Sequence, residues 1–142
     1  MTQGKTYEIF ISHGWSNDEE YNRLIAELDS VPDFKWNNHS DIKFDPNLDP
    51  VSDVGFYALR KELEEQIRGA GCVVFISIAR SWTRRWIQHE LQIATGQSKP
   101  IVGIKPEIDA RRPQWEYLES TANEMVEWDI SAIVAAVKRC SL

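Results

Sequence analysis

The stretch "CVVFISIA", from Cys72 to Ala79, constrains the fold of this chain more than any other. It is apolar at nearly every position, rich in β-branched and aromatic side chains, and shorter than an ordinary helix. A strand that is apolar on both faces is typical of the middle of a parallel sheet with helices covering each side. The stretch therefore predicts the central strand of an α/β domain.

Other segments alternate between strand and helix patterns on either side of this stretch. Strands are predicted at "YEIFIS", "FKWNNHS", "KPIVGIKP" and "EMVEW". Apolar residues at helical spacing predict helices at "DEEYNRLIAELDSV", "YALRKELEEQIRGAG", "SWTRRWIQHELQIATG" and "DISAIVAAVKRC". Asn17 or Asp18 is expected to cap the first helix, and Asp129 the last. Residues 41–56, rich in Asp, Pro and Asn, are expected to form a long irregular loop.

This alternation predicts a single domain, residues 1–142, with a doubly wound parallel sheet of the flavodoxin-like kind. Right-handed crossovers favour five strands in the order 2-1-3-4-5, with helices on both faces. Ligands of such sheets bind beyond the carboxyl ends of the strands, where strands 1 and 3 diverge. "SHGW" after the first strand and "ARSW" after the third would line that crevice.

Composition excludes several classes of function. The net charge is −6, from 22 acidic and 16 basic residues, and no basic face is evident, so nucleic acid is not an expected partner. The start "MTQGKTYEIF" lacks the layout of a signal peptide, and the apolar runs fall far short of the roughly 20 residues that span a membrane. The two cysteines lack metal-ligand spacing. We therefore expect a cytoplasmic protein without membrane contact.

Glu90 interrupts an otherwise apolar helix face. Winding the segment from Ser81 at about 100° per residue places six apolar side chains on one half of the helix, with Glu90 in their middle; these are Trp82, Trp86, Ile87, Leu91, Ile93 and Ala94. An unpaired charge on the core side is costly. Glu90 is therefore either part of a structural ion pair with an arginine or a functional carboxylate facing the crevice.

The remaining candidates surround the same crevice. Arg80, Arg84 and Arg85 crowd the start of that helix, where a cation is unfavourable, so they are either solvated or hold an anion. We expect six residues to line a pocket: Ser12, His13, Trp15, Ser40, Trp82 and Trp86. No metal site is expected, because the histidines lack ligand spacing and the Asp45 to Phe56 segment fails the EF-hand pattern. Glycine-rich phosphate loops are also missing.

Several of these segments together resemble a TIR-like domain of the short bacterial and archaeal flavodoxin-like group. The matching pieces are "YEIFISHGW", "FKWNNHSDIKFDPNLDP", "ALRKELEEQIRGAGCVVFIS" and "SWTRRWIQHELQIATGQSKPIVGIKP". They span Tyr7 to Pro106. "WIQHEL" is the most specific, since it is similar to the tryptophan-x-x-x-glutamate element on the third helix of TIR domains. In TIR enzymes that glutamate cleaves NAD, which implies a catalytic role for Glu90.

The resemblance implies a function and its partners. Stand-alone TIR-like proteins of Thoeris-type antiviral defence convert NAD into an ADP-ribose-derived signal that activates a separate effector. This implies an NAD glycohydrolase or ADP-ribosyl cyclase with NAD as substrate and no cofactor. It also implies self-association or a triggering protein partner, and a role for the loop of residues 41–56 as a lid or assembly surface.

Two alternatives stay open. Some members of the TIR superfamily only assemble, so a non-catalytic interaction module is the first. A nucleoside deoxyribosyltransferase-like enzyme is the second, because it shares a flavodoxin-like sheet and uses a glutamate as nucleophile.

Overall fold

The computed structural model describes residues 5–12, 19–40, 53–76, 83–105 and 120–141. Within these ranges, five strands form one parallel sheet in the order β2-β1-β3-β4-β5. The strands are β1 (Thr6–Ser12), β2 (Lys35–Asn38), β3 (Cys72–Ile76), β4 (Ile101–Ile104) and β5 (Glu124–Val126). The predicted fold class and strand order 2-1-3-4-5 are confirmed.

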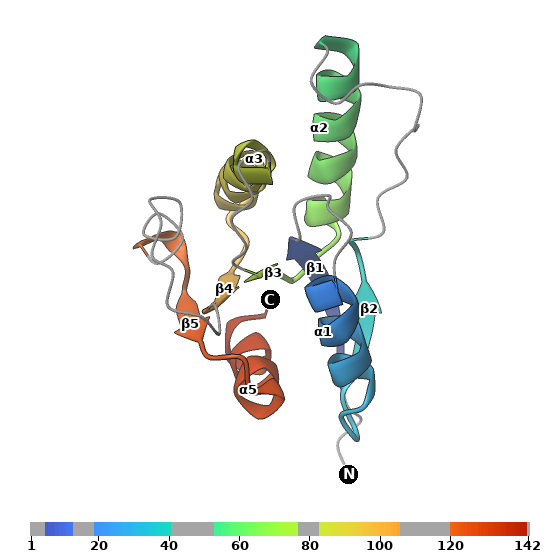
Figure 1. Ribbon diagram of the computed structural model, residues 1–142, viewed down its shortest axis with the longest axis vertical. Coiled ribbons are helices and arrows are strands. Elements are labelled where there is room, and N and C mark those ends of the chain that lie inside the picture. Colours follow the sequence, from blue (N-terminus) through green and yellow to red (C-terminus); the bar gives the residue numbers. More distant parts are fainter. Residues whose placement is uncertain (1–4, 13–18, 41–52, 77–82, 106–119, 142) are drawn as a thin grey trace.

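Helices cover both faces of this sheet. Figure 1 shows α2 (Asp53–Arg68) and α3 (Thr83–Gly96) on one side, and α1 (Glu19–Asp29) and α5 (Ile130–Cys140) on the other. None of the described helices is both long and apolar enough to cross a membrane. The strands are thus enclosed between two helical layers, as the apolar run of β3 predicted.

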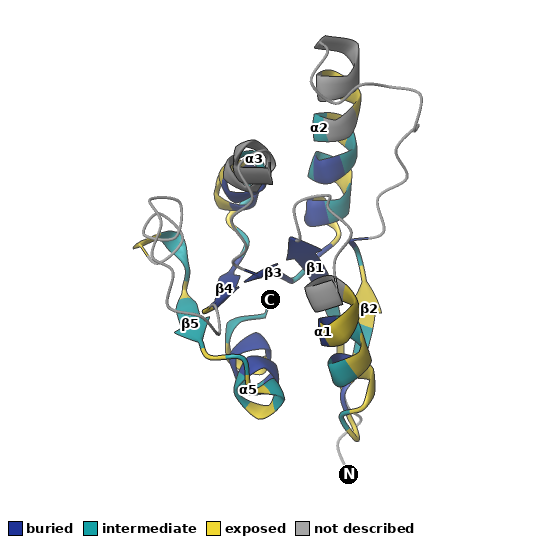
Figure 2. Ribbon diagram, in the orientation of Figure 1, coloured by how far each residue is buried: buried dark blue, intermediate teal, exposed yellow. Residues whose placement is uncertain are grey.

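The core has one part on each side of the sheet. All five residues of β3 are buried, as Figure 2 shows for the centre of the sheet. Val73 and Phe75 pack with the α2 and α3 side, whereas Cys72, Val74 and Ile76 pack with the α1 and α5 side. The alternation of side chains along a strand thus supplies both parts of the core from one element.

The helix α2 begins earlier than the sequence indicated. It starts at Asp53, so residues 53–56 belong to a helix and not to the expected loop. The Asp, Pro and Asn residues before them, together with Gly55, favoured the loop interpretation. Local propensity is a weak guide where tertiary packing anchors a helix, and the fully buried Leu63 and Ile67 anchor this one.

The helix α5 begins where its sequence predicted. The Asp129 side chain accepts a hydrogen bond from the backbone N–H of Ser131 at 3.2 Å, which confirms Asp129 as its N-cap. Lys138 and Arg139 lie in its last turn, where cations are favourable. Asn17 and Asp18, the expected caps of α1, lie outside the described residues.

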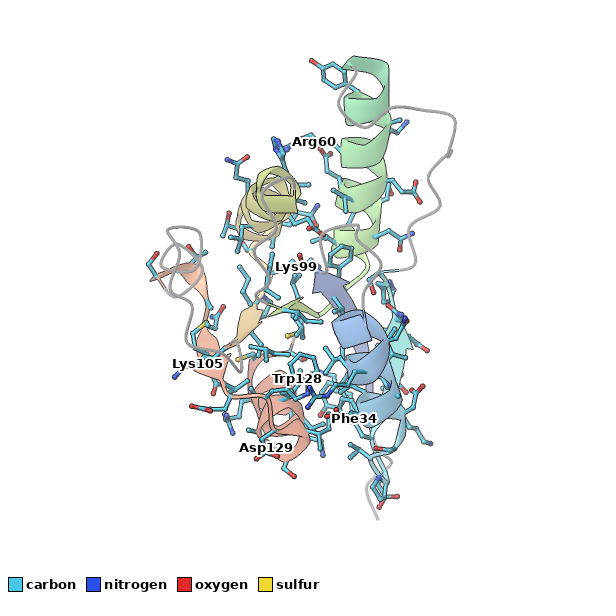
Figure 3. The ribbon with its side chains drawn as sticks, viewed as in Figure 1. Phe34, Arg60, Lys99, Lys105, Trp128 and Asp129 are labelled. Atoms are coloured by element: carbon cyan, nitrogen blue, oxygen red, sulfur yellow. The ribbon has the colours of Figure 1, made fainter. Side chains whose placement is uncertain are left out.

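Trp128 joins the two helices on this side of the sheet (Figure 3). Its Nε1 donates a hydrogen bond to Glu27 Oε1 at 3.2 Å, and the Arg23 guanidinium lies 4.4 Å from the centre of its ring. Arg23 also pairs with Glu27 at 2.7 Å. Trp128 precedes α5, so these contacts fix α1 against the junction between β5 and α5.

Candidate active site

Glu90 and Ser12 form a buried pair between α3 and β1. The Ser12 hydroxyl donates a hydrogen bond to Glu90 Oε1 at 2.9 Å, although the two residues are 78 positions apart in the chain. Only 1% of Ser12 and 2% of Glu90 is exposed. Because Ser12 is the last residue of β1, the pair lies at the carboxyl end of that strand. Ligands of doubly wound sheets bind at this edge.

Strand alternation and helix periodicity bring the two side chains together. Along β1, Ile9 and Ile11 pack toward α1 and α5, whereas Phe10 packs toward α2 and α3. Ser12, two residues beyond Phe10, faces the same way. On α3, Leu91 and Ala94 are buried beside Glu90. The expected position of Glu90 on the core side of its helix is confirmed, and its catalytic role stays a prediction.

Burial controls the ionisation of Glu90. Loss of hydration raises the pKa of its carboxyl to about 8, and the hydrogen bond from Ser12 acts in the opposite direction. None of the ion pairs between described residues includes Glu90. The ion pair considered as a structural alternative is therefore not seen in this part of the chain. With this pKa, Glu90 is mostly a neutral acid at pH 7.

Ser40 is the second of the six predicted pocket residues whose side chain the structure describes. It follows β2, is 2% exposed, and both its backbone N–H and its hydroxyl donate to Asn38 Oδ1, the former at 2.8 Å. These bonds fix the end of β2. They do not connect Ser40 with Glu90.

The other predicted pocket residues, and the three arginines expected to be solvated or to hold an anion, lie wholly or partly outside the described residues. His13, Trp15, Trp82 and Arg80 lie outside the described residues. Trp86, Arg84 and Arg85 belong to α3 by their backbone, but their side chains are not described. The stacking and anion-binding roles expected of them stay predictions.

The sequence interpretation missed a polar cluster at the opposite end of β1. His39 Nε2 lies 2.6 Å from Glu8 Oε1, and Asn37 Nδ2 donates to Glu8 Oε1 and Oε2 at 3.2 and 3.0 Å. The hydrogen bond with His39 is the main cause that lowers the pKa of Glu8. Its signal in the sequence was the alternation of Glu8, Phe10 and Ser12, which puts an acid on the same face of the sheet as Phe10.

A second missed contact joins α2 and α3 beside Glu90. Arg60 Nη1 lies 3.2 Å from Nδ1 of His89, and Arg60 Nε pairs with Glu64 at 3.2 Å; Figure 3 labels Arg60 between these helices. His89 therefore contacts α2, whereas its neighbour Glu90 faces β1. Nowhere in the described ranges do three potential metal ligands gather.

The sequence family is decided by one match. A family model described as Thoeris protein ThsB, TIR-like domain, matches residues 10–111, well over half of the 142 residues. The chain belongs to the Thoeris ThsB TIR-like family. The matched residues include Ser12, Ser40 and Glu90. Among curated proteins, none shows significant sequence similarity to this ThsB TIR-like domain.

Solved structures share the fold of the ThsB TIR-like domain. A 2-deoxyribosyltransferase from Bacillus psychrosaccharolyticus matches with a TM-score of 0.61 and 15% identity over 89% of this chain and 90% of the other. A conserved protein from Enterococcus faecalis matches with a TM-score of 0.60 and 8% identity, over 95% of this chain and 99% of the other. The CMP N-glycosidase BcmB from Clostridium botulinum matches with a TM-score of 0.51 and 11% identity, over 93% of this chain and 98% of the other. At such low identity these similarities support the fold alone.

Proposed function

We propose that this ThsB TIR-like domain cleaves the glycosidic bond between nicotinamide and ribose in NAD, with Glu90 as the catalytic carboxylate. The observation that carries the proposal is the burial of Glu90 against Ser12 at the carboxyl end of β1. A strongly perturbed acid at the ligand-binding edge of an α/β sheet is a functional-site candidate on physical grounds. Membership of the Thoeris family supports an ADP-ribose-derived product that signals in bacterial antiviral defence.

One carboxylate is sufficient for this reaction. Most glycosidases need a second carboxyl group to protonate the leaving oxygen. Nicotinamide leaves from a pyridinium cation as a neutral molecule, so it needs no proton. Glu90 then has two tasks, to bind the ribose hydroxyls and to stabilise the positive charge that develops at the anomeric carbon. Its apolar surroundings strengthen that electrostatic interaction.

Substrate charge reconciles the raised pKa of Glu90 with this role. In the free protein, burial raises this pKa to about 8, so the neutral acid predominates at pH 7. A pyridinium cation in the pocket favours the ionised form of a nearby carboxyl and lowers its pKa. NAD thus promotes the charge state of Glu90 on which its own cleavage depends.

The remaining pocket and partner assignments belong to the same proposal. Ser12, His13, Trp15, Ser40, Trp82 and Trp86 line the pocket around the dinucleotide, and the enzyme acts in the cytoplasm. Self-association or a triggering protein completes the site. Residues 41–52 contribute a lid or an assembly surface.

A nucleoside-cleaving enzyme is the second candidate, and one observation favours it. With a pKa of about 8, Glu90 at neutral pH is an acid that can donate a proton to a departing base, which is a different role from that of the nucleophile in a deoxyribosyltransferase-like enzyme. Pyrimidine and purine bases are poor leaving groups unless protonated, unlike nicotinamide. A 2-deoxyribosyltransferase and a CMP N-glycosidase share the fold.

Substrate consumption by purified protein separates these candidates. NAD, deoxynucleosides and CMP are each incubated with wild type, Glu90→Gln and Glu65→Gln over a range of protein concentrations, and the products are separated by chromatography. Glu65 is exposed on α2, so its substitution is the matched control for loss of one carboxylate. We expect wild type and Glu65→Gln to consume NAD and folded Glu90→Gln to be inactive.

Three other results would change the conclusion. Consumption of deoxynucleosides or CMP in place of NAD would favour the second candidate. Inert protein at every concentration would favour a non-catalytic assembly module. Equal NAD consumption by wild type and Glu90→Gln would remove Glu90 from the mechanism.

A further inference from the structure

The backbone of Ser12 is fixed more firmly than the side chain it contacts. Ser12 ends β1 and lies opposite Phe75 in the parallel register with the central strand β3, whereas the pairing of β1 with β2 ends at Ile9. Its side chain has a single carbon between backbone and oxygen. Glu90, in contrast, reaches the sheet through three rotatable bonds from a helix. The Ser12 hydroxyl is therefore the less mobile partner, and it fixes the orientation of the Glu90 carboxyl.

The described surroundings of Glu90 are otherwise apolar. The core cluster on the same side of the sheet includes Phe10, Phe75, Leu63, Ile67, Leu91 and Ala94. On the facing parts of α2 and α3, Arg60 contacts both Glu64 and His89. Further along the same face of β1, Glu8 is bound to His39 and Asn37. Among the described residues, Ser12 supplies the hydrogen bond that Glu90 accepts.

The single proton of the Ser12 hydroxyl is already committed. A serine hydroxyl has one O–H to donate, and here it is donated to Glu90 Oε1. Ser12 cannot donate the same proton to a ribose or phosphate oxygen of a ligand. Its chemical effect on a reaction therefore passes through Glu90.

We propose that Ser12 is the positioning residue of the site, whose hydroxyl holds Glu90 Oε1 and supports the ionised form of that carboxyl. A hydrogen bond from a hydroxyl to a carboxylate is stronger than one to a neutral acid, so the bond favours ionisation as well as orientation. Glu90 Oε2 takes no part in this bond. The consequence for catalysis rests on the proposed function, whereas the control of Glu90 ionisation by Ser12 does not.

The direct test follows the titration of Glu90 without any substrate. Protein labelled with ¹³C at the glutamate side-chain carboxyls is titrated by NMR as wild type, Ser12→Ala, Ser12→Thr and Ser30→Ala. Glu90→Gln identifies the Glu90 signal by its loss. Ser30 is an exposed serine after α1 whose hydroxyl donates to a backbone carbonyl, so Ser30→Ala is the matched control.

We expect Ser12→Ala to move the Glu90 midpoint to higher pH by about 1 unit, the size expected for loss of a hydrogen bond to a charged group. Ser12→Thr, which keeps the hydroxyl, and Ser30→Ala should titrate like wild type. If the extra methyl prevents Ser12→Thr from folding, Ser12→Cys keeps a weak donor and should give an intermediate midpoint. A midpoint in Ser12→Ala that equals the wild-type value overturns the proposal.

The catalytic consequence is tested by the pH profile of NAD cleavage. In Ser12→Ala the rise of kcat/KM should move to higher pH together with the NMR midpoint. A side chain that merely lines the pocket would change KM and leave the profile in place.

Failure of this inference is distinguishable from failure of the proposed function. If wild type does not cleave NAD, the proposed function fails, and the NMR midpoint still decides the role of Ser12. If NAD cleavage depends on Glu90 but the NMR midpoint of Glu90 is the same in Ser12→Ala as in wild type, this inference fails and the proposed function stands.

Discussion

The ionisation of Glu90 links the stability of this domain to pH. Its pKa in the folded protein, about 8, lies above the ordinary value of 4.5 that it has when unfolded. The folded state therefore holds a proton that the unfolded state loses. The associated stability is fully present below about pH 4.5 and is lost as pH rises through about 8.

Replacing Glu90 by glutamine should remove this dependence. From about pH 5 to pH 8, the unfolding free energy of wild type should fall relative to that of Glu90→Gln, by up to about 1.4 kcal/mol per pH unit. Urea unfolding of both proteins across this range measures the difference. The unfolding free energy of Glu65→Gln, which lacks an exposed carboxylate, should change with pH as that of wild type does. Parallel curves for wild type and Glu90→Gln would contradict the raised pKa.

The same ionisation should appear in the NAD reaction. Because the proposed catalytic form is the carboxylate, kcat/KM for NAD should rise about tenfold per pH unit below the pKa of Glu90 in the free enzyme and level off near pH 8. Rates measured at low NAD concentration across this range give the profile. A profile that falls with rising pH would instead indicate an acid that donates a proton.

The sequence could predict the position of Glu90 but not its partner. Helix periodicity alone places Glu90 among Leu91 and Ala94, and the structure buries all three. The contact with Ser12 depends on which face of β1 lies under α3. The strand order and the crossover connection determine which face of β1 lies under α3. The residues around Ser12 do not specify either.

At the scale of elements, the start of α5 depends on one cap. The Asp129 side chain satisfies the backbone N–H of Ser131. Asp129→Ala should lower the unfolding free energy by about 1 kcal/mol, and Asp129→Ser should restore most of it. Thermal unfolding of the two variants beside Glu127→Ala, an exposed neighbour outside the helix, measures the effect. An unchanged Asp129→Ala protein would show that the cap contributes little.

The end of α2 depends on the lack of a side chain at Gly69. A Cβ there would lie 3.0 Å from His39 Nδ1 and 3.1 Å from Cε1, so the ring, which contacts Glu8, must give way by a few tenths of an ångström. Gly69→Ala should therefore destabilise the domain by on the order of 1 kcal/mol.

Gly96, the last residue of α3, is the matched control. A Cβ there meets nothing within 4 Å, so Gly96→Ala should be neutral or stabilising by up to about 1 kcal/mol. Urea unfolding compares the two variants. Equal effects of both substitutions would contradict the role of the His39 contact.

Most elements were predictable because their patterns are local. Apolar runs predicted β3 and β4, and spacing with a capping residue predicted α5. The start of α2 was not predictable, because residues 53–56 have a loop-like composition. The buried residues that anchor their helix, Leu63 and Ile67, lie further along it. The extent of an element follows its tertiary contacts as well as its own residues.

At the scale of the whole molecule, the two thiols should report how the domain opens. Burial raises the pKa of Cys72 to about 12 and, with help from the Glu124 carboxylate, that of Cys140 to about 11. Both are therefore poor nucleophiles while the protein is folded. Cys72 begins the central strand, whereas Cys140 lies at the end of α5.

Alkylation at increasing urea concentration should therefore modify Cys140 before Cys72. Fraying of α5 exposes the first thiol, but only separation of the central strands exposes the second. Mass spectrometry of digested protein measures both sites. Simultaneous labelling would instead show that α5 opens only with the whole sheet.

The whole-molecule arrangement was predictable where handedness rules apply. Alternating strands and helices with right-handed crossovers leave few strand orders, and 2-1-3-4-5 is the one observed. The cluster of Glu8, Asn37 and His39 could not be predicted in the same way. It requires the register of β2 on β1, and a shift by one residue would turn these side chains to the other face.

The bond between Ser12 and Glu90 also bears on how the protein is made. A ribosome releases β1 long before α3, so a growing chain exposes Ser12 while Glu90 has not yet been added. Truncated products that stop before residue 90 contain the beginning of the sheet and lack Glu90. If this domain consumes NAD, a host cell is protected from its unfinished copies, because the chemistry becomes possible only after two distant parts of the chain have met.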